Sequence, residues 1–168
     1  MLWAAAWYAI DQVSKWAVIQ ALSASGDAIR VTPFFRLVLG WNDGVSFGLF
    51  GGSGVPPWIL AALSTAIAVA VLVWLGRATT FWIRAAAGLV GGGALANATD
   101  RLRFGAVTDF LDFHVWSLHW PAFNLADTGI VVGTGLLMLH SLGGDAGRAE
   151  PGIENRRETR NTPDGGRL

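Results

Sequence analysis

Cysteine is absent from this chain and charged residues are scarce. None of the 168 residues is Cys, and only 14% are Asp, Glu, Lys or Arg. Without Cys the chain has no disulfide, no thiolate nucleophile and no Cys-ligated metal. Soluble domains typically carry about 25% charged residues. A chain this poor in charge, with 52% hydrophobic residues, therefore indicates that lipid is part of its solvent.

The charges that are present balance in sign and gather at one end. The formal net charge is zero, which argues against a nucleic-acid partner. Nine charged residues fall within 148–168, a stretch with few apolar side chains. Such a stretch buries too little surface to fold alone. We therefore expect a membrane domain over 1–147 and a disordered cytoplasmic tail over 148–168.

Four segments are long and apolar enough to be membrane spans. The clearest, Pro56 to Leu75, is uncharged over 20 residues and would measure about 30 Å as a helix. Three others carry ionisable residues: Met1 to about Leu22, Phe81 to about Thr99, and about Ala122 to Leu142. The pattern predicts an all-α membrane protein with four transmembrane helices. Ionisable groups inside such spans are costly and usually functional.

The arginines near the span ends favour a cytoplasmic location for both termini. One side would carry Arg77, Arg84, Arg148, Arg156, Arg157 and Arg160, and the other side would carry Arg30, Arg36, Arg101 and Arg103. The side with more arginines is expected to be cytoplasmic. The two large connecting segments then face outward.

Each outward segment has its own pattern. In the segment at about 25–55, the run LVLGWNDGVSFGLF places Asn42-Asp43-Gly44 between two apolar stretches, which predicts a β-hairpin or small sheet. Turn formation alone would account for those three residues. The segment at about 101–121 mixes acidic and His residues with aromatic ones. That mixture is typical of a chain on the membrane surface, and we expect a surface helical segment there.

Polar residues within the first and third spans form two groups. Asp11 and Lys15 are four residues apart, so on a helix they share a face and neutralise each other. A structural ion pair that allows the first span to insert is favoured over a catalytic role. Asn97, Asp100 and Arg101 form a polar face at the outer end of the third span. An ion pair between Asp100 and Arg101 is an alternative account of that face.

Two further carboxylates are expected at the outer side. Asp109 stands between apolar neighbours, and Asp127 follows Asn124 by three residues at the start of the fourth span. Asp127 could alternatively cap the helix or complement its dipole. Two carboxylates that share a proton can activate a water and protonate a leaving amine, as in aspartic proteases. Such a site needs no metal and no cofactor.

The histidines do not form a metal site by spacing. His114 and His119 are five residues apart in a connecting segment, and no acidic pair completes a ligand set of known type. His140 lies near the inner end of the fourth span, where an interfacial location is expected. We therefore expect no metal centre.

Five motifs, taken in their order and spacing, resemble the signal peptidase II family of bacteria, the lipoprotein signal peptidases. They are Asp11-Gln12-Val13-Ser14-Lys15, Asn42-Asp43-Gly44-Val45-Ser46-Phe47, Gly92-Gly93-Ala94-Leu95-Ala96-Asn97-Ala98-Thr99-Asp100-Arg101, Val107-Thr108-Asp109-Phe110 and Phe123-Asn124-Leu125-Ala126-Asp127. The resemblance implies a multi-pass inner-membrane aspartic endopeptidase, with its active site near the outer face. Its substrates would be prolipoproteins that carry diacylglycerol on a Cys, cut just before that Cys.

The resemblance also assigns roles to residues. It places the catalytic pair at Asp109 and Asp127, with Asp100 as the rival for the first position. Asp109 is preferred because Arg101 beside Asp100 would keep that acid ionised. The residues implied to bind substrate or orient the acids are Asn42, Asn97, Arg101 and Asn124, with Asp11 and Lys15 supporting the site. The implied partners are lipid-modified prolipoproteins, membrane lipid and globomycin-type inhibitors, with the chain as a monomer.

Two other classes of function are considered. In a small proton-coupled transporter or channel, Asp11, Lys15, Asp100 and Asp127 would form a relay. That class predicts polar residues in the second span, where Ser64 and Thr65 are the polar side chains present. A non-catalytic subunit of a membrane assembly would leave the pairing of Asp109 with Asp127 unexplained.

Overall fold

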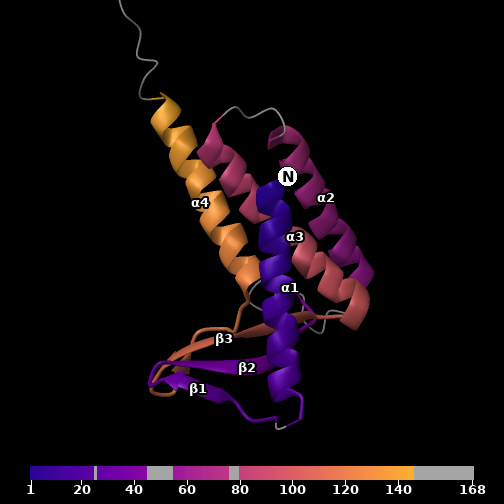
Figure 1. Cartoon of the computed structure of the whole chain (residues 1–168), viewed down its shortest axis with the longest axis vertical. Coiled ribbons are helices and arrows are strands. Elements are labelled where there is room, and N and C mark those ends of the chain that lie inside the picture. Colours follow the sequence, from indigo (N-terminus) through magenta and orange to yellow (C-terminus); the bar gives the residue numbers. More distant parts are fainter. Residues whose placement is uncertain (25, 45–54, 76–79, 146–168) are drawn as a thin grey trace, which may run out of the picture.

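A computed structural model describes residues 1–24, 26–44, 55–75 and 80–145 of the chain. It consists of long helices with an antiparallel four-stranded sheet at one end of them (Figure 1). In chain order the elements are α1 (Leu2–Leu22), β1 (Ile29–Thr32), β2 (Phe35–Asn42), α2 (Pro57–Leu75), α3 (Phe81–Phe104), β3 (Val107–Val115), β4 (Leu118–His119) and α4 (Leu125–Asp145). The predicted tail at 148–168 lies outside the described residues.

Helix α3 is the helix on which the others pack, since it contacts α1, α2 and α4. Its small residues make this possible. A Cβ added at Gly92 would lie 2.5 Å from the carbonyl oxygen of Ala4, and one added at Gly93 would lie 2.5 Å from that of Ala126. Neither position has room for a side chain, so the backbones of α1 and α4 approach α3 directly. This close approach brings the polar end of α3 against both neighbours.

All four predicted spans are helical, with shifted ends. Helix α3 continues past Thr99 to Phe104 and ends at Gly105, whose left-handed φ of 77° is typical of a helix terminus. Helix α4 begins at Leu125 rather than at Ala122. Two of the helices are long and apolar enough to cross a membrane by length and composition, over Pro57–Trp74 and Leu125–Leu142.

The sheet has the order β1-β2-β3-β4, and each neighbouring pair is antiparallel. Strand β2 pairs with β3 so that Gly40 is opposite Asp109 and Asn42 is opposite Val107. The small sheet expected from the sequence is therefore present. Its first hairpin turns between Thr32 and Phe35. The part of the predicted hairpin that follows Asn42-Asp43-Gly44 lies at 45–54, outside the described residues.

The surface helical segment predicted at about 101–121 is wrong. Residues up to Phe104 belong to α3, and Val107–Val115 form strand β3. The run VTDFLDFHV is rich in β-branched and aromatic residues, which favour a strand. Its aromatic residues suited a membrane surface, but the segment pairs antiparallel with β2, with one register shift between Leu37 and Gly40. The sheet is consequently larger than the segment 25–55 alone could form.

A small apolar core fixes the sheet to α1. Val18 and Leu22 of α1 and Phe110 of β3 are buried together, and Leu37 and Leu111 pack against them. Burying a side chain of this size contributes about 1.5–3 kcal/mol. Because Phe110 is the neighbour of Asp109, this core also holds the backbone of that acid in place.

Candidate active site

A buried cluster around Lys15 connects the elements that form the site. The Lys15 Nζ lies 2.9 Å from Asp11 Oδ2, 3.0 Å from Asp100 Oδ2 and 2.9 Å from Asn97 Oδ1. Since an ammonium group has three donors, all of them are used. The ion pair predicted between Asp11 and Lys15 is thus confirmed, and it extends from α1 to α3.

The carboxylates of this cluster also hold backbone groups. Asp11 Oδ1 accepts a hydrogen bond of 2.7 Å from the backbone N–H of Ala126, in the first turn of α4, where backbone donors lack intrahelical partners. Asp100 Oδ2 accepts one of 3.0 Å from the N–H of Thr108, at the start of β3. Gln12 adds a contact of 2.8 Å from its Nε2 to Asp100 Oδ1. The cluster therefore sets the positions of β3 and α4, which carry the two acids.

The alternative ion pair between Asp100 and Arg101 does not form. Asp100 pairs with Lys15, whereas Arg101 donates to the carbonyl oxygen of Gly44 at 2.7 Å and to that of Asn97 at 3.4 Å. Adjacent residues on a helix point in different directions, so they do not face each other. The Nε of Arg101 is buried without a hydrogen-bond partner among the described residues.

Asp109 receives an amide donor on each carboxylate oxygen. Asn124 Nδ2 lies 2.6 Å from Asp109 Oδ1, and Asn42 Nδ2 lies 2.9 Å from Asp109 Oδ2. Burial raises the pKa of Asp109 to about 6, and the nearby charge of Asp127 adds to the increase, while the two amide donors oppose it. This carboxyl therefore exchanges its proton near neutral pH, as a catalytic acid or base requires.

Asp127 is held differently from Asp109. Asn97 Nδ2 lies 2.8 Å from Asp127 Oδ1. Among the described residues, Asp127 Oδ2 has no hydrogen-bond partner. Asn124 Oδ1 accepts from the backbone N–H of Asp127 at 2.9 Å, which is the geometry of a helix N-cap. Asn124 therefore performs the capping role considered for Asp127, and the same side chain also contacts Asp109.

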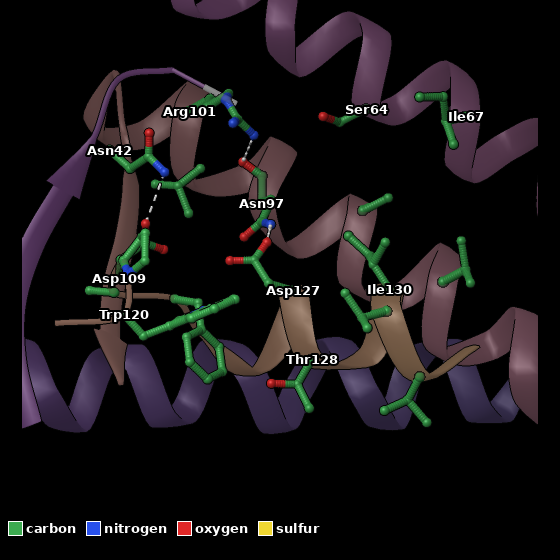
Figure 2. A pocket seen from close by; sticks show the side chains of 18 residues that line it. Asn42, Ser64, Ile67, Asn97, Arg101, Asp109, Trp120, Asp127, Thr128 and Ile130 are labelled. Carbon is green, nitrogen blue, oxygen red and sulfur yellow. Dashed lines mark hydrogen bonds between the residues drawn. The ribbon is translucent and has the colours of Figure 1, made fainter. Parts of the chain in front are cut away.

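A cavity of about 480 Å³ joins the two acids, and Figure 2 shows it from close by. Its polar end is lined by Asn42, Asn97, Arg101, Asp109, Trp120 and Asp127. Its other end is mostly apolar and lies between α2, α3 and α4, with Ile67 and Val131 among the lining residues. Val131 is 70% exposed and Ile67 is 48% exposed. The apolar end thus opens sideways, on the outer surface of the helices.

The predicted site residues fall into two groups. Asn42, Asn97, Arg101, Asp109 and Asp127 line the cavity, and Asn124 bonds to the carboxylate of Asp109 and to the backbone N–H of Asp127. The others, Asp11, Lys15 and Asp100, lie in the buried cluster. Asn97 belongs to both groups, because its side chain contacts Lys15 and Asp127.

Several residues of the cavity and of the cluster around Lys15 were not identified as site residues from the sequence. Trp120 belongs to the segment at about 101–121 that was expected on the membrane surface, yet it lines the cavity. Gln12 lies inside the first motif, and its contact with Asp100 appears only when α1 packs on α3. Ser64 also lines the cavity. Its signal in the sequence was a hydroxyl that, with the adjacent Thr65, interrupts an otherwise apolar span.

A second polar group lies on the sheet, away from the cavity. Asp112 contacts Arg36 Nε at 2.5 Å and His119 Nδ1 at 3.0 Å. Although burial acts in the opposite direction, the hydrogen bonds from His119 and Arg36 hold the pKa of Asp112 below its usual value. No group of three His, Cys, Asp or Glu side chains in the described ranges is arranged to hold a metal ion.

Comparisons with known proteins give consistent results. The family model for signal peptidase (SPase) II matches residues 3–143. The lipoprotein signal peptidase of Rhodopseudomonas palustris strain TIE-1 is 44% identical over 140 residues, which is 80% of this chain and 85% of that protein. The one from Paraburkholderia phymatum is 43% identical over 134 residues, covering 79% of this chain and 80% of that protein.

A solved structure of a bacterial membrane enzyme has a similar fold. A structure described as a bacterial membrane enzyme superposes with a TM-score of 0.77 and 26% identity, covering 91% of this chain and 93% of the other. The family match covers all four helices and the sheet. The chain therefore belongs to the signal peptidase II family and is a membrane peptidase.

Proposed function

We propose that this chain is an aspartic endopeptidase that removes signal peptides from diacylglyceryl-modified prolipoproteins by cleaving before the lipidated Cys. The observation that carries the proposal is that Asp109 of β3 and Asp127 of α4 line one cavity and are connected through Asn124. The related proteins named lipoprotein signal peptidases support the class of substrate.

The chemistry follows from two carboxyls that share one proton. The ionised carboxylate removes a proton from a water molecule as the water oxygen bonds to the scissile carbonyl carbon. The protonated carboxyl stabilises the developing oxyanion. A proton then passes to the leaving amine as the C–N bond breaks. The open Oδ2 of Asp127 and the raised pKa of Asp109 suit this exchange.

The other polar residues position this pair. Asn42, Asn97 and Asn124 orient the two carboxyls through their amide groups. Arg101 lines the same cavity, where it is available to the substrate backbone. Asp100, the rival for the first catalytic position, is bonded to Lys15 and to the N–H of Thr108. That arrangement favours a supporting role for Asp100, together with Asp11 and Lys15.

We further propose that the four helices cross the bacterial inner membrane as a monomer, with both termini cytoplasmic and the active site near the outer face. The ionisable residues of α1 face inward, since Asp11 is 0% and Lys15 is 2% exposed. Large apolar residues such as Trp74 and Leu139 point outward, where membrane lipid would cover them. A lipidated substrate helix would approach sideways from the bilayer through the apolar opening beside Val131.

The fully paired cluster around Lys15 also weighs against a proton relay. A relay needs groups that take up and release protons along a path. Here each donor of Lys15 is bonded to a carboxylate or amide oxygen, and Asp11 also binds the N–H of Ala126. A cluster bonded in this way holds helices together rather than passing protons.

The experiment is cleavage of a lipid-modified prolipoprotein by the purified full chain in detergent. We expect a single cut, with mass spectrometry showing the lipidated Cys at the new N-terminus. The same precursor without diacylglycerol is the matched control and should remain uncut. A chelator should leave the rate unchanged, and a globomycin-type inhibitor should abolish it. Equal cleavage of both precursors, or a cut at another bond, would contradict the proposal.

A further inference from the structure

Ser64 is a hydroxyl residue at the boundary between the polar and apolar ends of the cavity. It lies on α2 and lines the same cavity as Asn97 and Asp127. A Cβ added at Gly105, just beyond α3, would lie 3.9 Å from Pro57 Cγ, so α2 begins where α3 ends. Ser64 is seven residues into α2 and Asn97 is seven residues from the end of α3. The two side chains therefore lie at one depth.

Figure 2 shows how Ser64 is directed. Its side chain extends from α2 into the cavity, across from Asn97, with the hydroxyl oxygen on the side where Arg101 lies. Ile67, one turn further along α2, faces the same space. Ser64 is thus the polar member of an otherwise apolar wall.

Within the part of the chain that the structure describes, the hydroxyl of Ser64 is not used by the protein itself. Hydroxyls on membrane helices usually donate to the carbonyl four residues earlier. Thr65, Thr99 and Thr128 do so, at 2.8, 2.9 and 3.0 Å. Ser64 has no hydrogen-bond partner among the described residues. An unpaired hydroxyl at lipid depth is unfavourable, unless a ligand supplies the partner.

The substrate of the proposed function would bring such partners. The signal peptide of such a substrate would be an apolar helix that ends near the cut, and the last carbonyls of a helix have no intrahelical donor. The diacylglyceryl group adds ester carbonyls at the same place. Both are hydrogen-bond acceptors without donors of their own, and both would enter the apolar end of this cavity.

We propose that Ser64 is a specificity-determining residue that donates a hydrogen bond to a carbonyl oxygen of the bound substrate. This inference rests on the proposed function. It assigns to α2 a polar contact that the dyad and its asparagines do not provide. The contact is made in the bound substrate and in the transition state alike, so it strengthens binding more than it accelerates the chemical step.

The test compares Ser64→Ala with Thr65→Ala in cleavage of a lipid-modified prolipoprotein by the full chain in detergent. Loss of one neutral hydrogen bond should raise KM about threefold to tenfold and leave kcat within about twofold. Thr65 is the matched control, because it carries a hydroxyl on the same helix but bonds to Ala61 and does not line this cavity. Ser64→Thr should restore a KM near that of the unaltered chain.

The source of the carbonyl is found with two substrates. One carries the ordinary ester-linked diacylglyceryl group, and the other carries ether-linked chains that lack the ester carbonyls. If Ser64 binds an ester carbonyl, Ser64→Ala raises KM for the ester-linked substrate alone. If it binds a peptide carbonyl, the KM rises equally for both substrates.

Two results would overturn the inference, and they are distinct from failure of the proposed function. The first is an unchanged KM in Ser64→Ala with both substrates, while the unaltered chain cleaves them normally. The second is an equal increase of KM in Thr65→Ala, which would indicate a general effect on α2. Absence of cleavage by the unaltered chain would instead refute the proposed function and this inference together.

Discussion

Two pairs of aspartates in this molecule differ in their partners. Asp11 and Asp100 share the ammonium group of Lys15, deep between α1 and α3. Asp109 and Asp127 have amide groups of asparagines instead, and they line a cavity. A cation stabilises the ionised form of a carboxylate strongly, whereas neutral amides do so less. Under the proposed function, one residue type thus serves as structure in one place and is available for proton transfer in another.

The largest expected effect is loss of cleavage activity when either aspartate of the cavity pair is replaced. Asp109→Asn and Asp127→Asn should each lower kcat by about a thousandfold or more. Each variant lacks one of the two carboxyls that accept the proton of the water and donate a proton to the leaving amine. The melting temperature in detergent should not fall below that of the unaltered chain. Cleavage rates and thermal unfolding of the purified variants provide the measurement.

A matched control for this prediction is available on the same strand. Asp112→Asn removes a carboxylate that lies outside the cavity, bonded to Arg36 and His119, and should keep most of the activity. A dead Asp112→Asn with an active Asp109→Asn would reverse the assignment on β3. Full activity of Asp127→Asn would refute the dyad.

The second effect is a loss of folding stability when the cation shared by Asp11 and Asp100 is removed. Lys15→Met removes the cation from a buried cluster and leaves two carboxylates without their partner. Breaking a buried pair in this way typically costs about 3–5 kcal/mol, so the free energy of unfolding should fall by that order. Denaturant unfolding in mixed micelles measures it. A stable Lys15→Met chain that is inactive would instead indicate a direct part in catalysis.

The third effect concerns the pH dependence of stability. The pKa of Asp109 is raised from 3.8 to about 6 in the folded chain, so the folded state holds this proton more tightly than the unfolded state. Stability from this residue is therefore complete below about pH 4 and is lost as the pH rises through about 6. The difference is about two pKa units, or about 3 kcal/mol.

Asp109→Asn should lack this loss, since an amide does not titrate. Thermal unfolding of both chains from pH 4 to pH 7 should show the unaltered chain losing stability relative to the variant. If the melting temperatures of the two chains changed in parallel over that range, the pKa of Asp109 would not be raised. One physical reason for assigning Asp109 to the catalytic pair would then be removed.

The smallest expected effect is a shift in the pH profile of activity. The amide of Asn42 lowers the pKa of Asp109, so Asn42→Ala should raise it further. The limb of the kcat/KM profile near pH 6 should move to higher pH, by less than about one unit. Such limbs belong to the coupled pair rather than to one residue. A lower rate with an unmoved limb would assign Asn42 to substrate binding alone.

Much of this arrangement could be predicted from the sequence where local pattern was sufficient. The uncharged run at Pro56–Leu75 became α2 with its start moved by one residue. The four-residue spacing of Asp11 and Lys15 predicted their ion pair correctly. Both inferences depend on helix periodicity and length, which neighbouring residues determine.

The predictions that failed depended on distant partners. The aromatic residues of 107–115 suited a membrane surface, and pairing with β2, about 70 positions earlier in the chain, made the segment a strand. An ion pair of Asp100 with its neighbour Arg101 was one alternative that the sequence left open, but the packing of α1 on α3 supplied Lys15 instead. Local spacing could not indicate either choice.

By itself the sequence determined the medium, the helices and the motifs, because hydropathy, length and residue spacing are local properties. Too few charges remain for a soluble surface, and those in the spans stand in recognisable patterns. The tertiary structure alone decided that β3 and α4 bring Asp109 and Asp127 to one cavity, with Asn124 bonded to the carboxylate of Asp109 and to the backbone N–H of Asp127. The physical reason is that hydrogen bonds and ion pairs form between groups that are near in space, whatever their separation along the chain.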